Sequence, residues 1–313
     1  MNFPDGIDKD KIYLQEVFFP GEQNGIRIYI KRIDLVHPFI SGNKWFKLKY
    51  NIIKAREEEY ETILTFGGAY SNHVHATAAA GREFGFNTIG IIRGEEHLPL
   101  NPTLAFAVQA GMKIFYVNRS GYRSKHLPEF RQRLIEKFGR TYIVPEGGTN
   151  LLAVKGSSEI PSLIEIDFDY LCTACGTAGT ISGLIAGMDG RKKILGFSVL
   201  RGGAFLIKQT EKLLNDYSGK SYSNWSINLD YHFGGYAKIN RELVLFIRQF
   251  EDLNGILLDP IYTGKMMYGI FDLSRSGCFE TGSKIVALHT GGLQGVEGMR
   301  QKMNLLLYNS SKI

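Results

Sequence analysis

Short runs of β-branched and aromatic residues alternate with helical patterns through most of this chain. The runs that we expect to form strands are 61–66, 87–92, 112–117, 140–144, 169–174, 193–199 and 284–289. The patterns that we expect to form helices are 71–83, 103–110, 127–137, 180–188, 241–251 and 265–273. Strands that alternate with crossover helices are typical of parallel sheets, so the sequence predicts an α/β fold.

The length of the chain indicates more than one lobe. The chain has 313 residues, and a domain usually contains about 100–200. No internal repeat or low-complexity linker marks a boundary in the sequence. We expect a smaller lobe at residues 51–149, inserted into a larger lobe made of residues 1–50 and 150–313.

Composition and charge narrow the classes of function. The longest apolar runs are far shorter than the ~20 residues of a membrane-spanning helix. Residues 1–6 lack the basic and apolar regions of a signal peptide, so a cytoplasmic protein without a membrane partner is expected. The formal net charge is +6, but the basic residues are scattered and no nucleic-acid-binding motif is present, so no nucleic-acid partner is expected. This charge suits either solubility alone or an enzyme that handles anionic small molecules.

The three cysteines give little sign of metal or redox chemistry. Cys172, Cys175 and Cys278 are odd in number, which argues against a disulfide framework in a chain without an export signal. Cys172 and Cys175 have the C-x-x-C spacing of thioredoxins at a predicted strand-to-helix junction, but two cysteines cannot complete a four-ligand zinc site. Small buried cysteines after a strand are common packing residues. We therefore expect no metal.

The segment Ser41–Tyr50 places a glycine, an amide and a lysine directly before an amphipathic stretch. Lysine forms Schiff bases with carbonyl cofactors when its pKa is lowered or its proton is removed locally. A lysine near a helix start is otherwise usually a solvated surface residue. The role of Lys44 therefore depends on whether loops further along the chain provide the other groups that a lysine-bound cofactor needs.

Glycine-rich and hydroxyl-rich loops follow several predicted strands, and ligands of open α/β sheets bind at such loops. The run Gly176, Thr177, Ala178, Gly179 and Thr180 precedes a predicted helix. Its glycines allow close approach of the backbone, and the N–H groups of a helix start favour an anion. Because neither nucleotide-binding glycine pattern is present, the predicted guest is a phosphate monoester. The alternative is a turn that only packs a helix on the sheet.

Three further loops carry polar residues after or between strands. Ser71 precedes Asn72 at a predicted helix start, where serine most often serves only as an N-cap. Tyr262 precedes Thr263 in a second loop, and a tyrosine there either acts as an acid or base or simply packs. Thr290 follows the last predicted strand, at the place of a strand-end ligand or of a plain turn.

Taken in order after Gly42-Asn43-Lys44, these loops resemble the pyridoxal-phosphate enzymes of the 1-aminocyclopropane-1-carboxylate deaminase and D-cysteine desulfhydrase family. The likeness runs from about Pro38 to Gly292. It implies the two-lobed tryptophan-synthase-β-like fold (fold type II), with pyridoxal 5'-phosphate in the cleft between the lobes. It also implies a small amino-acid substrate and a homodimer.

The resemblance assigns roles to individual residues. Lys44 matches the lysine that forms the Schiff base, and Lys47 a second lysine near the phosphate; spacing alone does not choose between them. Asn72 matches the asparagine that bonds the phenolic oxygen of the cofactor, and Ser71 the serine beside the substrate carboxylate. Residues 176–180 match the phosphate loop.

Further matches bear on the reaction. Tyr236 and Tyr262 match the two active-site tyrosines. Deaminases carry a glutamate and a leucine at the cofactor-site positions held here by Thr263 and Thr290, and threonines there are the desulfhydrase pattern. The prediction is α,β-elimination from D-cysteine, giving pyruvate, sulfide and ammonia.

Departures from the family pattern leave other reactions open. The family usually has smaller or different residues at Trp45, Phe46, Tyr70 and His75, so a bulkier, more aromatic pocket is one expectation. The alternatives are 1-aminocyclopropane-1-carboxylate deamination, a racemase or lyase for a larger amino acid, and a non-catalytic anion-binding protein.

Overall fold

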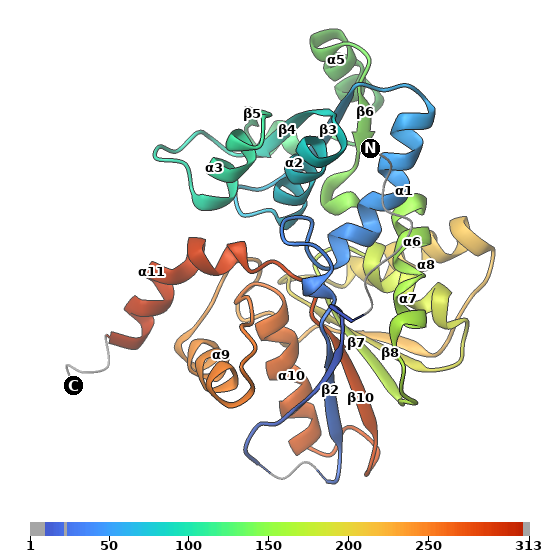
Figure 1. The fold of residues 1–313 in the computed structure, drawn as a ribbon, viewed down its shortest axis with the longest axis vertical. Coiled ribbons are helices and arrows are strands. Elements are labelled where there is room, and N and C mark those ends of the chain that lie inside the picture. The colour runs from blue at the N-terminus through green and yellow to red at the C-terminus, as the bar shows by residue number, and fades with distance from the viewer. Residues whose placement is uncertain (1–9, 22–23, 309–313) are drawn as a thin grey trace.

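The structure is a computed structural model that describes residues 10–21 and 24–308. The sequence prediction about residues 1–6 therefore lies outside the described residues. Two lobes, each built on its own sheet, lie one above the other in Figure 1. Within the described ranges, no helix has the length and apolar character needed to cross a membrane.

The larger sheet has six strands, and five of them run parallel. Its order is β1 (Leu14–Val17), β2 (Arg27–Lys31), β10 (Lys284–Leu288), β7 (Tyr170–Cys175), β8 (Lys193–Ser198) and β9 (Trp225–Asn228). Only β1 pairs antiparallel with its neighbour. The central strands β10 and β7 are apolar along almost their whole length, as expected where helices cover both faces of a parallel sheet.

The smaller sheet has four parallel strands. Its order is β5 (Met112–Val117), β4 (Asn87–Arg93), β3 (Thr62–Gly67) and β6 (Tyr142–Val144). All four were predicted as strands, and the predicted α/β class is confirmed. The boundaries proposed at residues 50 and 150 remain predictions, and the first helix runs continuously across the boundary at residue 50.

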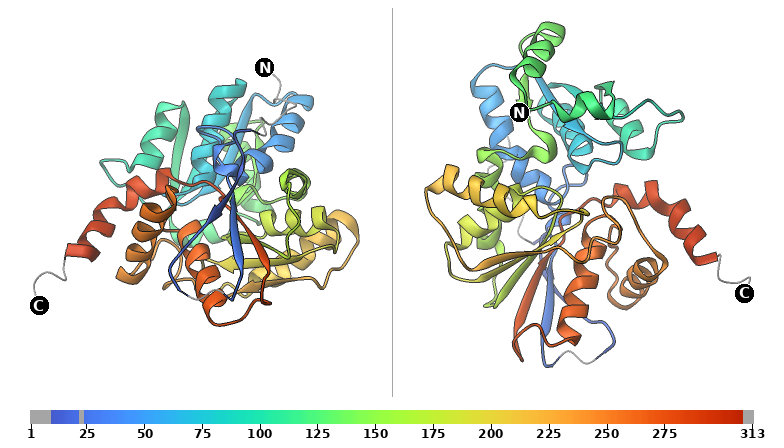
Figure 2. Two further views of the ribbon diagram at one scale, coloured as in Figure 1. Left: turned by 60° about the horizontal axis from the view of Figure 1, so that its bottom comes forward. Right: turned by 180° about the vertical axis from the view of Figure 1, so that it is seen from behind.

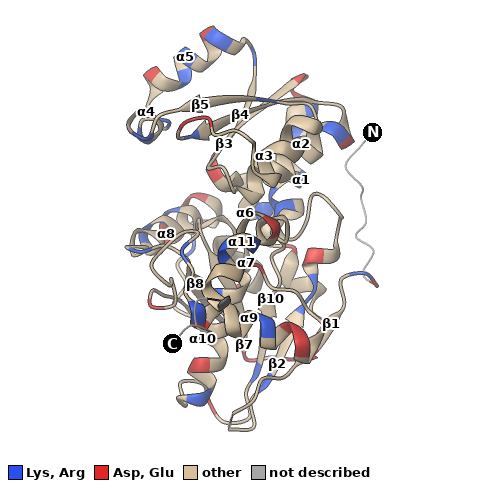
Figure 3. Cartoon of the chain, turned by 90° about the vertical axis from the view of Figure 1, so that its left-hand side faces the viewer, with Lys and Arg blue, Asp and Glu red and all other residues tan. Residues whose placement is uncertain are grey.

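Helices pack around both sheets (Figures 1 and 2). They are α1 (Asn43–Glu57), α2 (Asn72–Phe84), α3 (Pro102–Gln109), α4 (Arg119–Arg123), α5 (Pro128–Phe138), α6 (Leu151–Ser157), α7 (Gly179–Met188), α8 (Phe205–Ser218), α9 (Arg241–Asn254), α10 (Thr263–Arg275) and α11 (Gln294–Tyr308). Single 3-10 turns occupy Ile33–Leu35, Glu146–Gly148 and Ile160–Leu163. Figure 3 shows basic and acidic residues spread over both lobes.

Several elements of the structure were not predicted from the sequence. These were β1, β2 and β9, which have four or five residues each, and the helices α4, α6, α8 and α11. The cysteine motif lies close to its predicted place, because Cys172 is inside β7 and Cys175 is the last residue of that strand, before α7. Their side chains pack into two different apolar clusters, and burial raises the pKa of Cys175 to about 12.

Candidate active site

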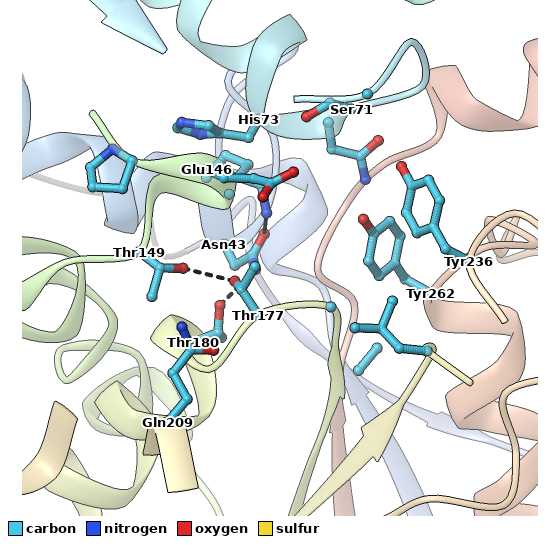
Figure 4. Close-up of a pocket in the computed structure, with 18 of the residues that line it drawn as sticks. Asn43, Ser71, His73, Glu146, Thr149, Thr177, Thr180, Gln209, Tyr236 and Tyr262 are labelled. Carbon is cyan, nitrogen blue, oxygen red and sulfur yellow. Dashed lines mark hydrogen bonds between the residues drawn. The ribbon is translucent and has the colours of Figure 1, made fainter. Parts of the chain in front are cut away.

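A cavity of about 640 Å³ lies where the carboxyl ends of the parallel strands in the two sheets meet (Figure 4). Its wall takes residues from the segments that follow β3, β6, β7, β8 and β10, and from Arg93 at the end of β4. This is the expected position for a ligand of α/β sheets, because loops at these strand ends converge on one edge. The residues proposed for the site that line this cavity are Lys44, Ser71, Asn72, Gly176, Thr177, Thr180, Tyr236, Tyr262 and Thr290.

Lys44 reaches the cavity from the first turn of α1. Gly42 has φ 63°, and a Cβ on it would lie 2.0 Å from the carbonyl oxygen of Thr290, so only glycine lets the two loops touch. The Lys44 Nζ donates to Asn43 Oδ1 at 3.1 Å, and the Asn43 amide donates to Thr180 Oγ1 at 2.8 Å. Burial lowers the pKa of Lys44 to about 8, although the charge of Asp259 opposes that shift. About one tenth of this amine is therefore neutral and nucleophilic at pH 7, compared with a far smaller fraction of an ordinary lysine.

Lys47 lies one turn later on α1 and points behind the cavity wall. It is 1% exposed, and its Nζ donates to Thr149 Oγ1 at 3.2 Å and to Thr177 Oγ1 at 3.4 Å. Burial lowers the pKa of Lys47 well below its usual value, and the charge of Lys44 adds to that effect. In the described part of the chain, no carboxylate forms an ion pair with it.

The amine of Lys47 and the start of α7 together form a place for an anion. A Cβ on Gly179 would lie 3.0 Å from both the Lys47 Nζ and Thr149 Oγ1, so glycine keeps this space narrow but open. The hydroxyls of Thr149 and Thr177 bond each other at 2.8 Å (Figure 4). Free N–H groups at a helix start, hydroxyls and a buried amine are the donor set that a phosphate monoester needs.

Two tyrosines form the opposite wall. The ring centroids of Tyr236 and Tyr262 are 6.1 Å apart at an angle of 71°, and both side chains face the cavity (Figure 4). Tyr236 donates to the carbonyl of Tyr70 at 3.2 Å. Burial raises the pKa of both phenols, so both are protonated at neutral pH and are placed to give a proton rather than to take one.

The first turn of α2 forms a third wall. Ser71 is its N-cap and accepts from the Val74 N–H at 3.3 Å, as the sequence predicted for its local role. Asn72 Oδ1 accepts from the Gln294 amide at 2.6 Å. A Cβ on Gly292 would lie 2.2 Å from Asn72 Nδ2, which shows how closely the loop after β10 approaches this helix.

Four predicted cofactor-site residues do not line the cavity. Three of them lie behind the cavity wall. They are Lys47 on α1, Ala178 at the N-cap of α7 and Gly179 at the first position of α7. Thr263 is turned away, because its hydroxyl donates to Asp259 Oδ2 at 2.6 Å. A direct contact between Thr263 and the cofactor therefore remains a prediction.

Sequence reasoning missed the segment after β6. Glu146, Gly147 and Thr149 line the cavity, and Glu146 accepts from the Tyr122 hydroxyl at 2.9 Å and pairs with Lys125 at 3.2 Å. The run Glu146–Thr149 follows a predicted strand and contains two glycines, so the rule used for the other loops would have found it. Arg93 and Gln209 also line the cavity, and no local pattern marks them.

The aromatic departures from the family pattern lie outside the cavity. Trp45 and Phe46 are 4% and 0% exposed, and both belong to the core cluster that joins α1 to the large sheet. Tyr70 packs against α11, where a Cβ on Gly298 would lie 2.8 Å from its ring. None of the three lines the cavity, so the expectation that they make the pocket more aromatic is wrong.

The sequence profile of the family described as "Pyridoxal-phosphate dependent enzyme" matches residues 13–291. The chain belongs to the pyridoxal-phosphate dependent enzymes. It is therefore an enzyme, its cofactor is pyridoxal phosphate, and the fold is the two-lobed type predicted from the sequence. The buried Lys47, the open start of α7 and the reactive Lys44 fit the phosphate and the aldehyde of that cofactor.

Similar proteins place this enzyme in one branch of the family. It is 34% identical to a "Putative 1-aminocyclopropane-1-carboxylate deaminase" of Pyrococcus furiosus, over 87% of this chain and 86% of that one. It is 30% identical to the "Bifunctional D-cysteine desulfhydrase/1-aminocyclopropane-1-carboxylate deaminase, mitochondrial" of Arabidopsis thaliana, over 94% and 79%. A solved structure described as an "ACC deaminase homologue" has a TM-score of 0.82 and 29% identity, and covers 95% of this chain and 94% of that chain.

The lowered pKa of Lys44 predicts how the apoenzyme takes up its cofactor. Only the neutral amine attacks an aldehyde, so the rate of covalent uptake should rise about tenfold per pH unit below the pKa and become level above pH 8. The rate is measured from the growth of visible absorbance at fixed cofactor concentration. A rate that keeps rising to pH 10 would show that Lys44 has the pKa of an ordinary lysine.

Proposed function

We propose that this enzyme is a lyase of the D-cysteine desulfhydrase type. Its reaction would convert D-cysteine and water to pyruvate, hydrogen sulfide and ammonia. The observation that supports this choice is the threonine at position 290, whose side chain lines the cavity where the deaminases of this family carry leucine. Thr263 supports the same choice, because it holds the position where the deaminases carry a glutamate.

The bound cofactor supplies the electron sink that stabilises negative charge at Cα. Ser71 and the start of α2 would hold the substrate carboxylate, since hydroxyl and N–H donors at a helix start favour an anion. The neutral Lys44 would take the proton from Cα at its Nζ. Tyr236 or Tyr262 would give a proton to the departing sulfur as the Cβ–S bond breaks, because both phenols are protonated and face the cavity.

The purified holoenzyme should release equal amounts of pyruvate and sulfide from D-cysteine. We expect turnover of D-cysteine to exceed that of L-cysteine and of 1-aminocyclopropane-1-carboxylate by at least about tenfold, which corresponds to a difference of about 1.4 kcal/mol in transition-state binding. The three substrates are compared at equal concentration, with sulfide, pyruvate and 2-oxobutanoate measured separately. Dominant formation of 2-oxobutanoate would instead establish the deaminase.

The deaminase remains the second candidate because of one feature of the cavity. Glu146 places a carboxylate on the wall, and the hydroxyl of Tyr122 and the amine of Lys125 hold it there. An acid beside the reacting carbon would help to open a cyclopropane ring. The homodimer and the cytoplasmic location predicted from the sequence also remain proposals.

A further inference from the structure

The segment 259–265 begins and ends with buried charged residues that the proposed reaction does not use. Asp259 is 1% exposed and Lys265 is 0% exposed, and neither lines the cavity. Tyr262, which lies between them, does line it. A buried charge is costly unless its partners are well placed, so the partners of these two residues indicate their purpose.

Asp259 fixes the backbone that presents Tyr262. Its Oδ1 accepts from the N–H groups of Ile261 at 2.9 Å and Tyr262 at 2.7 Å. Its Oδ2 accepts from the N–H of Thr263 at 2.8 Å and from the Thr263 hydroxyl at 2.6 Å. These four bonds use the carboxylate fully at the start of α10, and none of them reaches another loop.

Lys265 reaches a different loop, the one that carries the second tyrosine. From the first turn of α10 its Nζ donates to the carbonyl of His232 at 2.9 Å and to the carbonyl of Gly235 at 2.8 Å. Burial lowers the pKa of Lys265 to about 8, so the amine is mostly charged at neutral pH and both bonds are charge-assisted. Gly235 is the residue directly before Tyr236.

The backbone that Lys265 holds is strained. Phe233 and Ala237 have φ of 51° and 54°, and Gly234 and Gly235 have φ of 90° and 116°. Residues other than glycine stay in the left-handed region only where their surroundings hold them there. The loop makes two successive turns, with Gly235 N–H bonded to His232 O at 2.9 Å and Lys238 N–H bonded to Gly235 O at 3.1 Å. The amine of Lys265 donates to the carbonyl that begins each turn, that of His232 and that of Gly235.

We propose that Lys265 is a positioning residue that holds Tyr236 beside Tyr262 at the cavity. The start of α10 then fixes the positions of both phenols. Tyr262 directly precedes the helix, and Tyr236 lies in the loop that the amine of Lys265 holds. The proposal rests on the proposed role of Tyr236 in the reaction. Its structural part, the restraint of residues 232–238, stands independently of the substrate.

The test compares Lys265→Met with Lys302→Met. Methionine keeps the unbranched apolar body of the lysine, up to the position of Cε, but removes the amine. Lys302 is an exposed residue of α11 whose Nζ contacts the carbonyl of Ala237 at 3.4 Å, so it controls for losing an amine near the same loop. Amide hydrogen exchange over 232–238 should become at least about tenfold faster in Lys265→Met than in Lys302→Met, since local opening controls that exchange. Equal exchange in the two variants would overturn the proposal, whatever the substrate is.

Kinetics of a double variant test the link to Tyr236. With D-cysteine, Lys265→Met should lower kcat about 10- to 100-fold, because a displacement near 1 Å of a reacting group costs up to about 10²-fold. In a Tyr236→Phe background the same change should have little further effect, since residues that act through one group are not additive. An equal loss in both backgrounds would show a merely structural role and overturn the proposal.

A second variant and a readout that does not depend on the substrate complete the test. Lys265→Gln keeps an uncharged NH2 donor group and should recover part of kcat, so the test stands even if Lys265→Met does not fold. If the wild-type enzyme leaves D-cysteine unchanged, the proposed function fails while hydrogen exchange still decides on the restraint. Normal cofactor absorbance in each variant is the control for an intact site.

Discussion

Replacing Lys44 with alanine is expected to lower turnover by about 10³-fold or more, because general acid–base catalysis alone contributes about 10²–10⁴-fold. Lys44 is the amine of α1 that lines the cavity, and its lowered pKa suits both covalent binding of the cofactor and transfer of a proton. Initial rates with saturating cofactor measure the effect. The fold should be unchanged, because the Lys44 amine bonds only its neighbour Asn43 among the described residues.

A matched variant separates this effect from the loss of any lysine on the same helix. Lys49 is paired with Glu159 at 2.8 Å, away from the cavity. Lys49→Ala should therefore keep near wild-type turnover and the visible absorbance of lysine-bound cofactor, and Lys44→Ala should lose both. Wild-type turnover in Lys44→Ala would remove this residue from the reaction.

Replacing Lys47 with methionine is expected to weaken cofactor binding about 100-fold. The amine is buried with two threonine hydroxyls as its hydrogen-bond partners, and a phosphate beside it would supply the missing negative charge. A hydrogen bond between charged groups contributes about 1.5–3 kcal/mol, and about 2.8 kcal/mol corresponds to a 100-fold change in Kd. Titration of the apoenzyme with pyridoxal phosphate gives the Kd.

Pyridoxal, which lacks the phosphate, shows whether Lys47 acts through that group. Wild-type protein and Lys47→Met should bind pyridoxal with similar affinity, while Lys49→Met should behave as wild type with both compounds. An equal loss of affinity for pyridoxal and for pyridoxal phosphate would show that Lys47 supports the general shape of the site instead. That result would leave the start of α7 as the main phosphate-binding element.

Local sequence signals predicted much of the site because each arises within a few residues. The N-cap at Ser71 and the glycine-rich start of α7 follow from backbone hydrogen bonding that closes within one turn. The parallel strands follow from apolar periodicity, and a parallel sheet brings the following loops to one edge. Separate loops could therefore be assigned to one site before their distances were known.

The sequence by itself determined the α/β class, several of the loops that meet at the cavity and the cofactor family of this protein. Only the tertiary structure decided that Lys44 faces the cavity while Lys47 lies behind its wall. It also decided that Thr263 bonds Asp259 and that Lys265 holds the loop before Tyr236. The physical reason is distance along the chain. Local periodicity reports which face of an element is buried, but the partner of a buried polar group is chosen by how the elements pack.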